Sequence, residues 1–384
     1  MKILHIITRL ILGGAQQNTI LSCRAQVEAG HEVLLAYGPI YGPEGSLLND
    51  AQNCGAQLIE VRSLRRAVLP GHDLHCYGSL RALIRKFNPD VVHTHSSKAG
   101  IVGRAAGWHC SVPAIIHTIH GLPFHERQSS FERNLYIAVE RWAAQRCHCL
   151  IGVTEAMTRA FEENDIGSGQ RFEVVPSGIE LSRFSQSHEL RASTRRAYRI
   201  APDAQVIGIV ARLDRFKGHD DLLDILPALV ARVPSLRVMF VGDGYHRKAL
   251  ECRVEQQKMQ SRVVFAGLVP FNQVPSLYQA MDVMVLPSYQ EGQPRTMLEA
   301  LLSGCGIVGY DSGGVGAICV DGKTGRLVPT GDTEALADAI LWMLENSGQR
   351  ALLTQAGFFH AQQNFGVQVM SNRLEKIYND VLGR

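Results

Sequence analysis

Two glutamates in one short stretch could hold hydroxyl groups beside an anion. The stretch, residues 286–304, reads L-P-S-Y-Q-E-G-Q-P-R-T-M-L-E-A-L-L-S-G, with Glu291 in a loop and Glu299 in the helix that follows. The start of a helix offers N–H groups and partial positive charge, so an anion can bind there. Carboxylates beside it would repel the anion itself but accept hydrogen bonds from adjacent hydroxyls, as on a sugar or a ribose.

The surrounding residues predict the elements that position this pair. The apolar run 281–285 predicts a buried strand, and Gly292 and Pro294 mark a loop before a helix that begins near Thr296 and ends at Gly304. We expect both glutamates to lie outside any apolar core. The alternative is one solvated loop glutamate and one ordinary helix glutamate, with no ligand.

Two cations precede the next predicted helix upstream. Arg212 follows an apolar strand, and Lys217 stands with Gly218 just before a helix. Cations in a strand-to-helix loop can neutralise a diphosphate. Glycine-rich segments follow three other strands, at 241–244, 265–268 and 311–314, and Gly242 would let a ligand approach the backbone.

Strands and helices alternate along both halves of the chain. In the second half the predicted strands are 206–211, 237–241, 262–266, 283–286, 306–310 and 325–328. In the first half they are 3–8, 32–37, 57–61, 91–95, 114–119, 150–153 and 172–175. This alternation predicts two parallel sheets covered by helices on both faces, and ligands bind such sheets at the carboxyl ends of their strands.

Histidines and a glycine pair mark the strand ends of the first half. Gly13-Gly14 follows the first strand, His93 and His95 lie in the 91–95 strand, and His120 ends the 114–119 strand. Zinc is one interpretation, but the spacing is not that of a helical metal motif and no cysteine or carboxylate stands nearby. Histidines at these strand ends favour a ligand-facing edge, and we expect no metal.

A basic segment lies between these strands. Arg65 and Arg66 stand among leucines and valine in S-L-R-R-A-V-L-P, and more basic residues follow in the helix up to Lys86. Such a run is usually a solvated face. The sharper hypothesis is a dock for anionic lipid headgroups.

Composition limits the class of protein. The chain has 384 residues, too many for one ordinary core, and its formal net charge of +3 gives no reason to expect a nucleic-acid partner. Nine scattered cysteines without a C-x-x-C pair favour reduced thiols. No apolar run is as long as a membrane span. We therefore expect a cytoplasmic protein, associated with the inner face of the cell membrane if the basic segment docks there.

Taken together, these residues resemble the retaining, GT-B-fold glycosyltransferases of glycosyltransferase family 4. The matching pieces are G-G-A at 13–15, H-T-H-S-S-K-A-G at 93–100, H-G at 120–121, R-L-D-R-F-K-G at 212–218, V-G-D-G at 241–244, E-G-Q-P-R-T-M-L-E-A at 291–300 and D-G-K-T-G-R-L-V-P at 321–329. The resemblance implies an α/β GT-B fold, with two Rossmann-like domains facing each other across a cleft. The expected divisions are an acceptor domain at 1–180, a linker at 181–203, a nucleotide-sugar domain at 204–366 and a returning helix at 367–384.

The resemblance also implies roles for individual residues. Arg212 and Lys217 would hold the diphosphate of a nucleotide sugar, which we expect to be a UDP-sugar, and Glu299 would accept from the ribose. Glu291 and His120 would contact the transferred sugar. The remaining expected donor contacts are Gly14, Gly242, Gly267, Leu268, Gly292, Gln293, Arg295 and Thr296. Arg65, Arg66 and Lys98 are expected to meet the membrane or the acceptor, a saccharide or polyprenyl-linked saccharide, and no cofactor is expected.

Two departures from the family pattern leave alternatives open. Gly316-Ala317 stands where the family commonly has Pro-Glu, which predicts a looser loop, and Pro294 lacks the backbone donor that many members present. The alternatives to a transferase of envelope polysaccharide assembly are a nucleotide-sugar epimerase or phosphorolytic enzyme of the same fold, or a non-catalytic nucleotide-sugar-binding partner protein.

Overall fold

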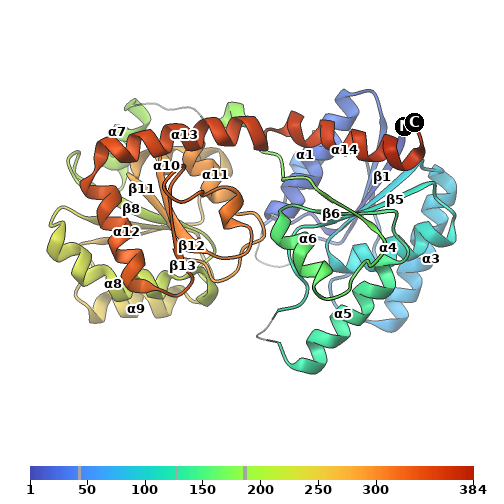
Figure 1. The fold of residues 1–384 in the computed structure, drawn as a ribbon, viewed down its shortest axis with the longest axis horizontal. Helices are drawn as coiled ribbons and strands as arrows, with labels where there is room; N and C mark the ends of the chain where they lie inside the picture. Colours follow the sequence, from blue (N-terminus) through green and yellow to red (C-terminus); the bar gives the residue numbers. More distant parts are fainter. Residues whose placement is uncertain (42–44, 126–127, 185–187) are drawn as a thin grey trace. The chain divides into compact units, whose positions relative to one another are not determined.

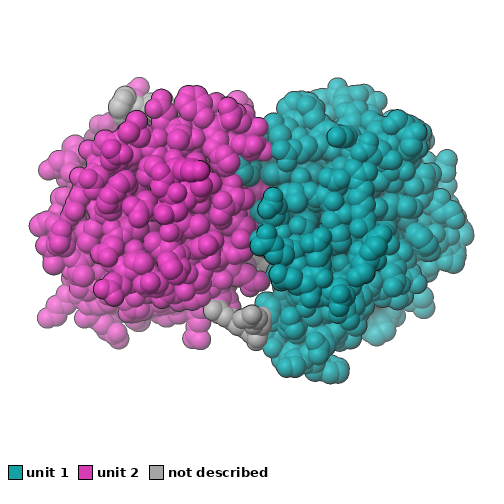
Figure 2. Space-filling model, viewed as in Figure 1, with its two compact units in different colours: residues 1–179, 365–384 teal, residues 180–364 magenta. Residues whose placement is uncertain are grey.

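A computed structural model of the chain describes residues 1–41, 45–125, 128–184 and 188–384 (Figure 1). These residues form two compact units, Met1–Ile179 with Phe365–Arg384 and Glu180–Asn364 (Figure 2). Each unit is an α/β structure built on a parallel sheet. The predicted α/β class with two doubly wound parallel sheets is confirmed.

Within the described residues, the sheet of the first unit has seven parallel strands in the order β3-β2-β1-β4-β5-β6-β7. The strands are β1 Lys2–Arg9, β2 Glu32–Gly38, β3 Gln57–Glu60, β4 Val91–His95, β5 Ala114–Ile119, β6 Cys149–Gly152 and β7 Arg171–Val174. Strands β4, β5 and β6 are buried along their whole length, as expected where helices cover both faces of a sheet.

Helices cover both faces of this first sheet. They are α1 Gly14–Glu28, α2 Leu48–Gln52, α3 Pro70–Phe87, α4 Ser97–His109, α5 Ser130–Ala144, α6 Glu155–Glu162 and α14 Val367–Leu382. Because strand side chains alternate, Leu4 and Ile6 of β1 pack with α3 and α4, whereas Ile3 packs with α1 and α14 on the other face. Helix α14 lies beside α1 (Figure 1), so the end of the chain completes the core of the first unit.

The described part of the second unit has a six-stranded parallel sheet in the order β10-β9-β8-β11-β12-β13. Its strands are β8 Val206–Val210, β9 Arg237–Val241, β10 Val263–Gly267, β11 Val283–Leu286, β12 Gly306–Asp311 and β13 Arg326–Pro329. Its helices are α7 His188–Ala197, α8 His219–Arg232, α9 Arg247–Gln256, α10 Val274–Ala280, α11 Arg295–Leu302, α12 Thr333–Glu345 and α13 Ser347–Phe365. Single 3-10 turns are η1 Leu181–Arg183, η2 Arg215–Lys217, η3 Phe271–Gln273 and η4 Val315–Ala317.

The segment at 181–203 does more than connect two sheets. It includes α7, whose Arg191 and Arg195 form ion pairs of 2.7 and 3.1 Å with Asp282. Asp282 also accepts a hydrogen bond from the N–H of Val206 at the start of β8. These contacts tie α7 to the amino-terminal ends of the strands in the second unit.

A buried ion pair joins two helices of the first unit. Arg104 of α4 and Glu140 of α5 are almost completely buried, and their Nη2 and Oε2 atoms lie 2.6 Å apart. Arg104 also donates from Nε to the Gly100 carbonyl within α4. Removing one member of such a pair leaves an uncompensated buried charge, whereas removing both does not.

We predict that Glu140→Leu lowers the free energy of unfolding by about 3–5 kcal/mol, because the Arg104 guanidinium stays buried without its carboxylate. The double variant Arg104→Met/Glu140→Leu should recover most of this loss. Thermal unfolding of both variants beside the wild-type protein measures the difference. A double variant no more stable than the single one would show that the ion pair does not compensate the buried charge.

Candidate functional site

In each sheet the strand order reverses once, between β8 and β11 in the second unit and between β1 and β4 in the first. The loops after these strands leave the carboxyl edge toward opposite faces of the sheet. Open α/β sheets bind ligands in the crevice that such a reversal creates. The residues with the strongest chemical signal in the sequence follow these same strands.

At the reversal of the second unit, a lysine and a glutamate are paired. Lys217 ends η2 after β8, and Glu291 lies in the loop after β11. The Lys217 Nζ and Glu291 Oε1 atoms are 2.6 Å apart, and the side chains are only 23% and 13% exposed. The sequence placed these residues 74 positions apart without predicting that they touch. A half-buried ammonium and carboxylate therefore stand together at the edge where a ligand would bind.

Glycines with positive φ bring the backbones of these loops together. Gly218 has a φ of +69°, and a Cβ there would lie 1.9 Å from the Pro287 carbonyl oxygen. Gly313 has a φ of +56°, and its Cβ would lie 2.0 Å from the Glu291 carbonyl oxygen. Ser312 braces the same loop by donating to the Ser288 carbonyl at 2.6 Å. No side chain fits at either glycine, so the Lys217–Glu291 ion pair depends on a glycine at both positions.

Arg212 lies near the start of the loop that follows β8 and leads to Lys217. Its side chain is 64% exposed, and its Nη2 atom lies 3.0 Å from Asp214 Oδ2. Asp214 also accepts from the N–H of Phe216 and from the hydroxyl of Tyr245, each at 3.1 Å. Burial opposes the ionisation of Asp214, but these bonds and the Arg212 guanidinium hold its pKa below the ordinary value. Asp214 thus anchors an exposed cation, a role that the sequence pattern did not assign.

Glu299 is buried, and the expectation that neither glutamate lies in a core is wrong for this residue. Its side chain is 4% exposed, and the Tyr278 hydroxyl donates to its Oε2 atom at 3.0 Å. Burial raises the pKa of Glu299, although the nearby Arg295 opposes the shift. All the other residues from Met297 to Leu302 in α11 are apolar and buried, so Glu299 lies in an enclosed part of the helix. That pattern was the available signal, whereas nothing in the sequence pointed to Tyr278.

The remaining predicted donor residues of the second unit lie along the same edge. Gly242 follows β9, and Gly267 is the last residue of β10. The N–H of Gly242 donates to the Gly267 carbonyl at 2.9 Å. Leu268 follows with its side chain 72% exposed. A Cβ at Gly242 would lie 2.1 Å from the Ala211 carbonyl oxygen. This glycine is therefore required by the packing of two adjacent loops.

The first turn of α11 completes this edge. Gly292 and Gln293 lie in the loop, Pro294 is the N-cap, and Arg295 and Thr296 are the first helical residues. A proline N-cap contributes no N–H to that end of the helix.

The loop in which Gly316-Ala317 replaces the expected Pro-Glu forms the turn η4. The N–H groups of Ile318 and Cys319 donate to the Val315 carbonyl, and the Ala317 carbonyl accepts from His360 Nε2 at 3.0 Å. Bonds of this kind close the turn without the missing glutamate.

In the first unit, a cavity of about 310 Å³ opens at the carboxyl ends of β4 and β5. Ser96, Ser97, His117, His120 and Glu140 supply most of its polar lining. Gly14, the first residue of α1, follows β1 at the same reversal, and Ala15 borders the cavity. The cavity therefore offers hydroxyl, imidazole and carboxylate groups beside the predicted residue His120.

Arg65, Arg66 and Lys98 have different surroundings. Arg65 and Arg66 are exposed, next to the exposed side chains of Val68 and Leu69 before α3. Lys98 is 12% exposed, with its Nζ atom 2.6 Å from Asp73 and 3.1 Å from the Ala67 carbonyl oxygen. The lysine thus fastens the start of α3 to α4.

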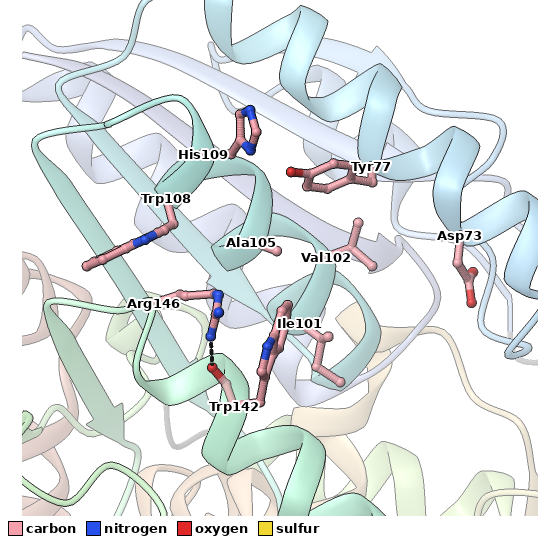
Figure 3. Close-up of a pocket in the computed structure, with 9 residues that line it drawn as sticks. All are labelled: Asp73, Tyr77, Ile101, Val102, Ala105, Trp108, His109, Trp142 and Arg146. Atoms are coloured by element: carbon pink, nitrogen blue, oxygen red, sulfur yellow. Dashed lines mark hydrogen bonds between the residues drawn. The ribbon is translucent and has the colours of Figure 1, made fainter.

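An apolar groove lies beside this segment (Figure 3). It has a volume of about 420 Å³ and is lined by Asp73, Tyr77, Ile101, Val102, Ala105, Trp108, His109, Trp142 and Arg146. The guanidinium of Arg146 lies 4.0 Å from the centre of the Trp142 ring. Among the described residues, no helix combines the length and the apolar character that crossing a membrane requires.

Two family descriptions match this chain. Residues 13–178 match the Glycosyl transferase 4-like domain, and residues 191–358 match Glycosyl transferases group 1. The D-inositol 3-phosphate glycosyltransferase of Corynebacterium aurimucosum is 30% identical over 76% of this chain and 72% of its own length. An Escherichia coli UDP-Gal:alpha-D-GlcNAc-diphosphoundecaprenol alpha-1,3-galactosyltransferase is 24% identical over 88% of this chain and 87% of its own.

A solved structure has the same fold. Anabaena HepE, crystallised in complex with UDP and glucose, superposes with a TM-score of 0.84 at 20% identity, over 99% of this chain and 100% of its own. The two parallel sheets, the matched families and the similar enzymes agree with one another. The chain therefore belongs to the group 1 glycosyl transferases, the GT-B-fold enzymes of glycosyltransferase family 4.

Proposed function

We propose that this enzyme moves a sugar from a UDP-sugar, with retention at the anomeric carbon, to a hydroxyl of a saccharide or lipid-linked saccharide in envelope polysaccharide assembly. The Escherichia coli relative supports the choice, because its name specifies UDP-galactose and a diphosphoundecaprenol-linked acceptor. Anabaena HepE, bound to UDP and glucose, supports the same donor class. The observation that carries the proposal is the Lys217–Glu291 pair at the strand-order reversal of the second unit.

The pair can exchange partners when a donor binds. A diphosphate would compete with Glu291 for the Lys217 ammonium, and the exposed guanidinium of Arg212 would add a second cation. Once Lys217 turns to phosphate, the Glu291 carboxylate is released to accept hydrogen bonds from sugar hydroxyls. Glu299, which is buried on α11, would accept a hydrogen bond from the ribose, while its Oε2 atom still accepts from the Tyr278 hydroxyl.

In the transfer step, the bond from the anomeric carbon to the diphosphate oxygen breaks, and a bond to the acceptor oxygen forms on the same face. Lys217 and Arg212 stabilise the charge on the departing diphosphate, which takes the bonding electron pair. The acceptor proton passes to the departing phosphate oxygen. The cavity beside His120, with Ser96, Ser97 and Glu140, would bind acceptor or sugar hydroxyls.

Release of UDP tests this assignment directly. UDP-sugars should raise the melting temperature of the protein, because a ligand that binds only the folded state stabilises it. Free UDP should then appear only when a saccharide acceptor is added. An epimerase would change the donor sugar without releasing UDP, and a non-catalytic partner protein would bind the donor without either change.

Lys217 and Glu291 should respond in opposite directions to mutation. Lys217→Ala should weaken UDP binding by roughly 10- to 100-fold, since a hydrogen bond to a charged group contributes about 1.5–3 kcal/mol. Glu291→Gln should leave UDP affinity unchanged or increase it, because it removes the competing carboxylate, and should lower turnover. Calorimetry with UDP and a UDP-release assay measure the two effects.

Arg232→Ala is the charge-matched control, since it removes one cation at the far end of α8, about 20 Å from the start of that helix. It should change neither UDP affinity nor turnover. Weaker UDP binding in Glu291→Gln would contradict the exchange of partners.

Glu299→Gln should separate ligand binding from stability. Because the folded pKa of Glu299 is raised, its burial destabilises the protein progressively as the pH rises above the ordinary carboxyl value of about 4.3. The variant lacks this penalty, so its melting temperature should rise relative to that of the wild type as the pH rises from the ordinary carboxyl value to the raised pKa of Glu299, and the difference should then stay constant. UDP affinity should fall in the same variant. A melting-temperature difference that shrinks as the pH rises would contradict the assignment of a raised pKa.

We also propose that the segment before α3, which contains Arg65 and Arg66, touches anionic membrane. Arg65→Glu/Arg66→Glu should weaken binding to phosphatidylserine vesicles by about 2 kcal/mol or more at low salt, since each basic residue near the surface contributes about 1 kcal/mol. Arg85→Glu/Lys86→Glu, at the other end of the same helix, makes the same change in net charge. If both double variants lose vesicle affinity equally, net charge and not this segment determines binding.

A further inference from the structure

Four histidines of the first unit form part of one continuous chain of hydrogen bonds. They are His5 of β1, His93 and His95 of β4, and His120 after β5. The chain also includes Gln26 of α1, Tyr378 of α14 and Thr118 of β5. Residues from both ends of the sequence thus meet on the face of the sheet that α1 and α14 cover.

The order of the chain follows from the distances. His120 Nε2 lies 3.0 Å from His95 Nδ1, and His95 Nε2 lies 2.9 Å from His5 Nδ1. His5 Nε2 lies 2.7 Å from Gln26 Oε1. Gln26 Nε2 donates to the Tyr378 hydroxyl at 3.2 Å. This hydroxyl oxygen lies 2.6 Å from His93 Nδ1, and the other ring nitrogen, His93 Nε2, lies 2.7 Å from Thr118 Oγ1.

The buried rings of this chain are neutral. Burial lowers the pKa of His5 to about 4 and lowers the pKa of His93 and His95 well below the ordinary histidine value. A neutral imidazole has one N–H donor and one acceptor nitrogen. Each ring must therefore donate to one neighbour and accept from the other, which gives the whole chain a direction.

Gln26 fixes that direction. Its amide N–H donates to Tyr378, so its Oε1 atom accepts from His5 Nε2–H. His5 Nδ1 then accepts from His95 Nε2–H, and His95 Nδ1 accepts from His120 Nε2–H. On the other side, the Tyr378 hydroxyl donates to His93 Nδ1. Every hydrogen bond in the chain then joins one donor to one acceptor.

We infer that this chain is a positioning device that holds His120 with its proton on Nε2, so that Nδ1 is the ring nitrogen that accepts or exchanges a proton. His5, His95, Gln26 and Tyr378 are positioning residues, since they act through His120, which lines the cavity at the carboxyl edge. A sugar hydroxyl that met this ring would donate to Nδ1. The consequence for catalysis rests on the proposed role of His120 in sugar transfer, but the tautomer itself does not.

A metal ion is the competing interpretation of the same residues. His5, His93 and His95 offer ligand atoms within 4.8 Å of one another. Each of these rings, however, has a protein partner at both nitrogens. An ion would have to break several of these bonds, which favours the hydrogen-bond chain.

Nitrogen NMR of the full chain, with ¹⁵N-labelled histidine, tests the inference without any substrate. At neutral pH, rings 5, 93, 95 and 120, assigned from single His→Gln variants, should each show a protonated Nε2 and an unprotonated Nδ1. Gln26→Leu removes the group that sets the direction, so ring 120 should become a mixture of tautomers. A wild-type His120 protonated on Nδ1, or metal-shifted resonances in the purified protein, would overturn the inference.

Kinetics tests the positioning role. Tyr378→Phe and Gln26→Leu should lower kcat by about tenfold, the effect of one misdirected hydrogen bond, and leave UDP affinity unchanged. Tyr136→Phe, which removes a phenol hydroxyl from α5 of the same unit, is the matched control and should change neither kcat nor UDP affinity. Full kcat in Tyr378→Phe and Gln26→Leu would overturn the role. Failure of every UDP-sugar to react would refute the proposed function, while the NMR result still decides the tautomer.

Discussion

A half-buried ion pair at one strand-order reversal sets the requirements for the rest of the second unit. For Lys217 and Glu291 to meet at 2.6 Å, the loops after β8 and β11 must approach at backbone distance. That approach requires a glycine at 218, and the loop after β12 must carry a second glycine at 313 to accommodate the Glu291 carbonyl. The parallel sheet supplies the common edge, and the glycines remove the side chains that would hold its loops apart.

The sequence predicted much of this arrangement because buried parallel strands are continuous apolar runs. Strand β11 lies at 283–286 and β4 at 91–95, as their apolar patterns predicted, and the residues after them lie at the carboxyl edge. What could not be predicted is pairing across long sequence distances. Tyr378 binds His93 from 285 positions away, and no local pattern encodes that contact. Glu299 shows a different failure, since we expected its carboxylate to lie outside any apolar core, whereas it is 4% exposed.

Burial determines whether the polar side chains near the carboxyl edges of the two sheets are charged or neutral. Lys217 and Glu291 are partly exposed and form an ion pair with each other. The desolvation cost of holding these two charges there is therefore modest. The histidines under α1 and α14 are almost entirely enclosed, and desolvation keeps them neutral. Neutral rings suit a chain of hydrogen bonds, because each offers one donor and one acceptor, whereas a charged ring would offer two donors and interrupt it.

This difference gives the carboxyl edges of the two units different properties. The charged edge of the second unit can respond to an incoming anion, since Lys217 has an alternative partner in any phosphate. The histidine chain of the first unit resists change, because reversing one bond requires reversing its neighbours. A chain with one direction therefore transmits the orientation of the Gln26 amide to His120 at the cavity. The C-terminal helix contributes Tyr378 to this chain, besides completing the core of the first unit.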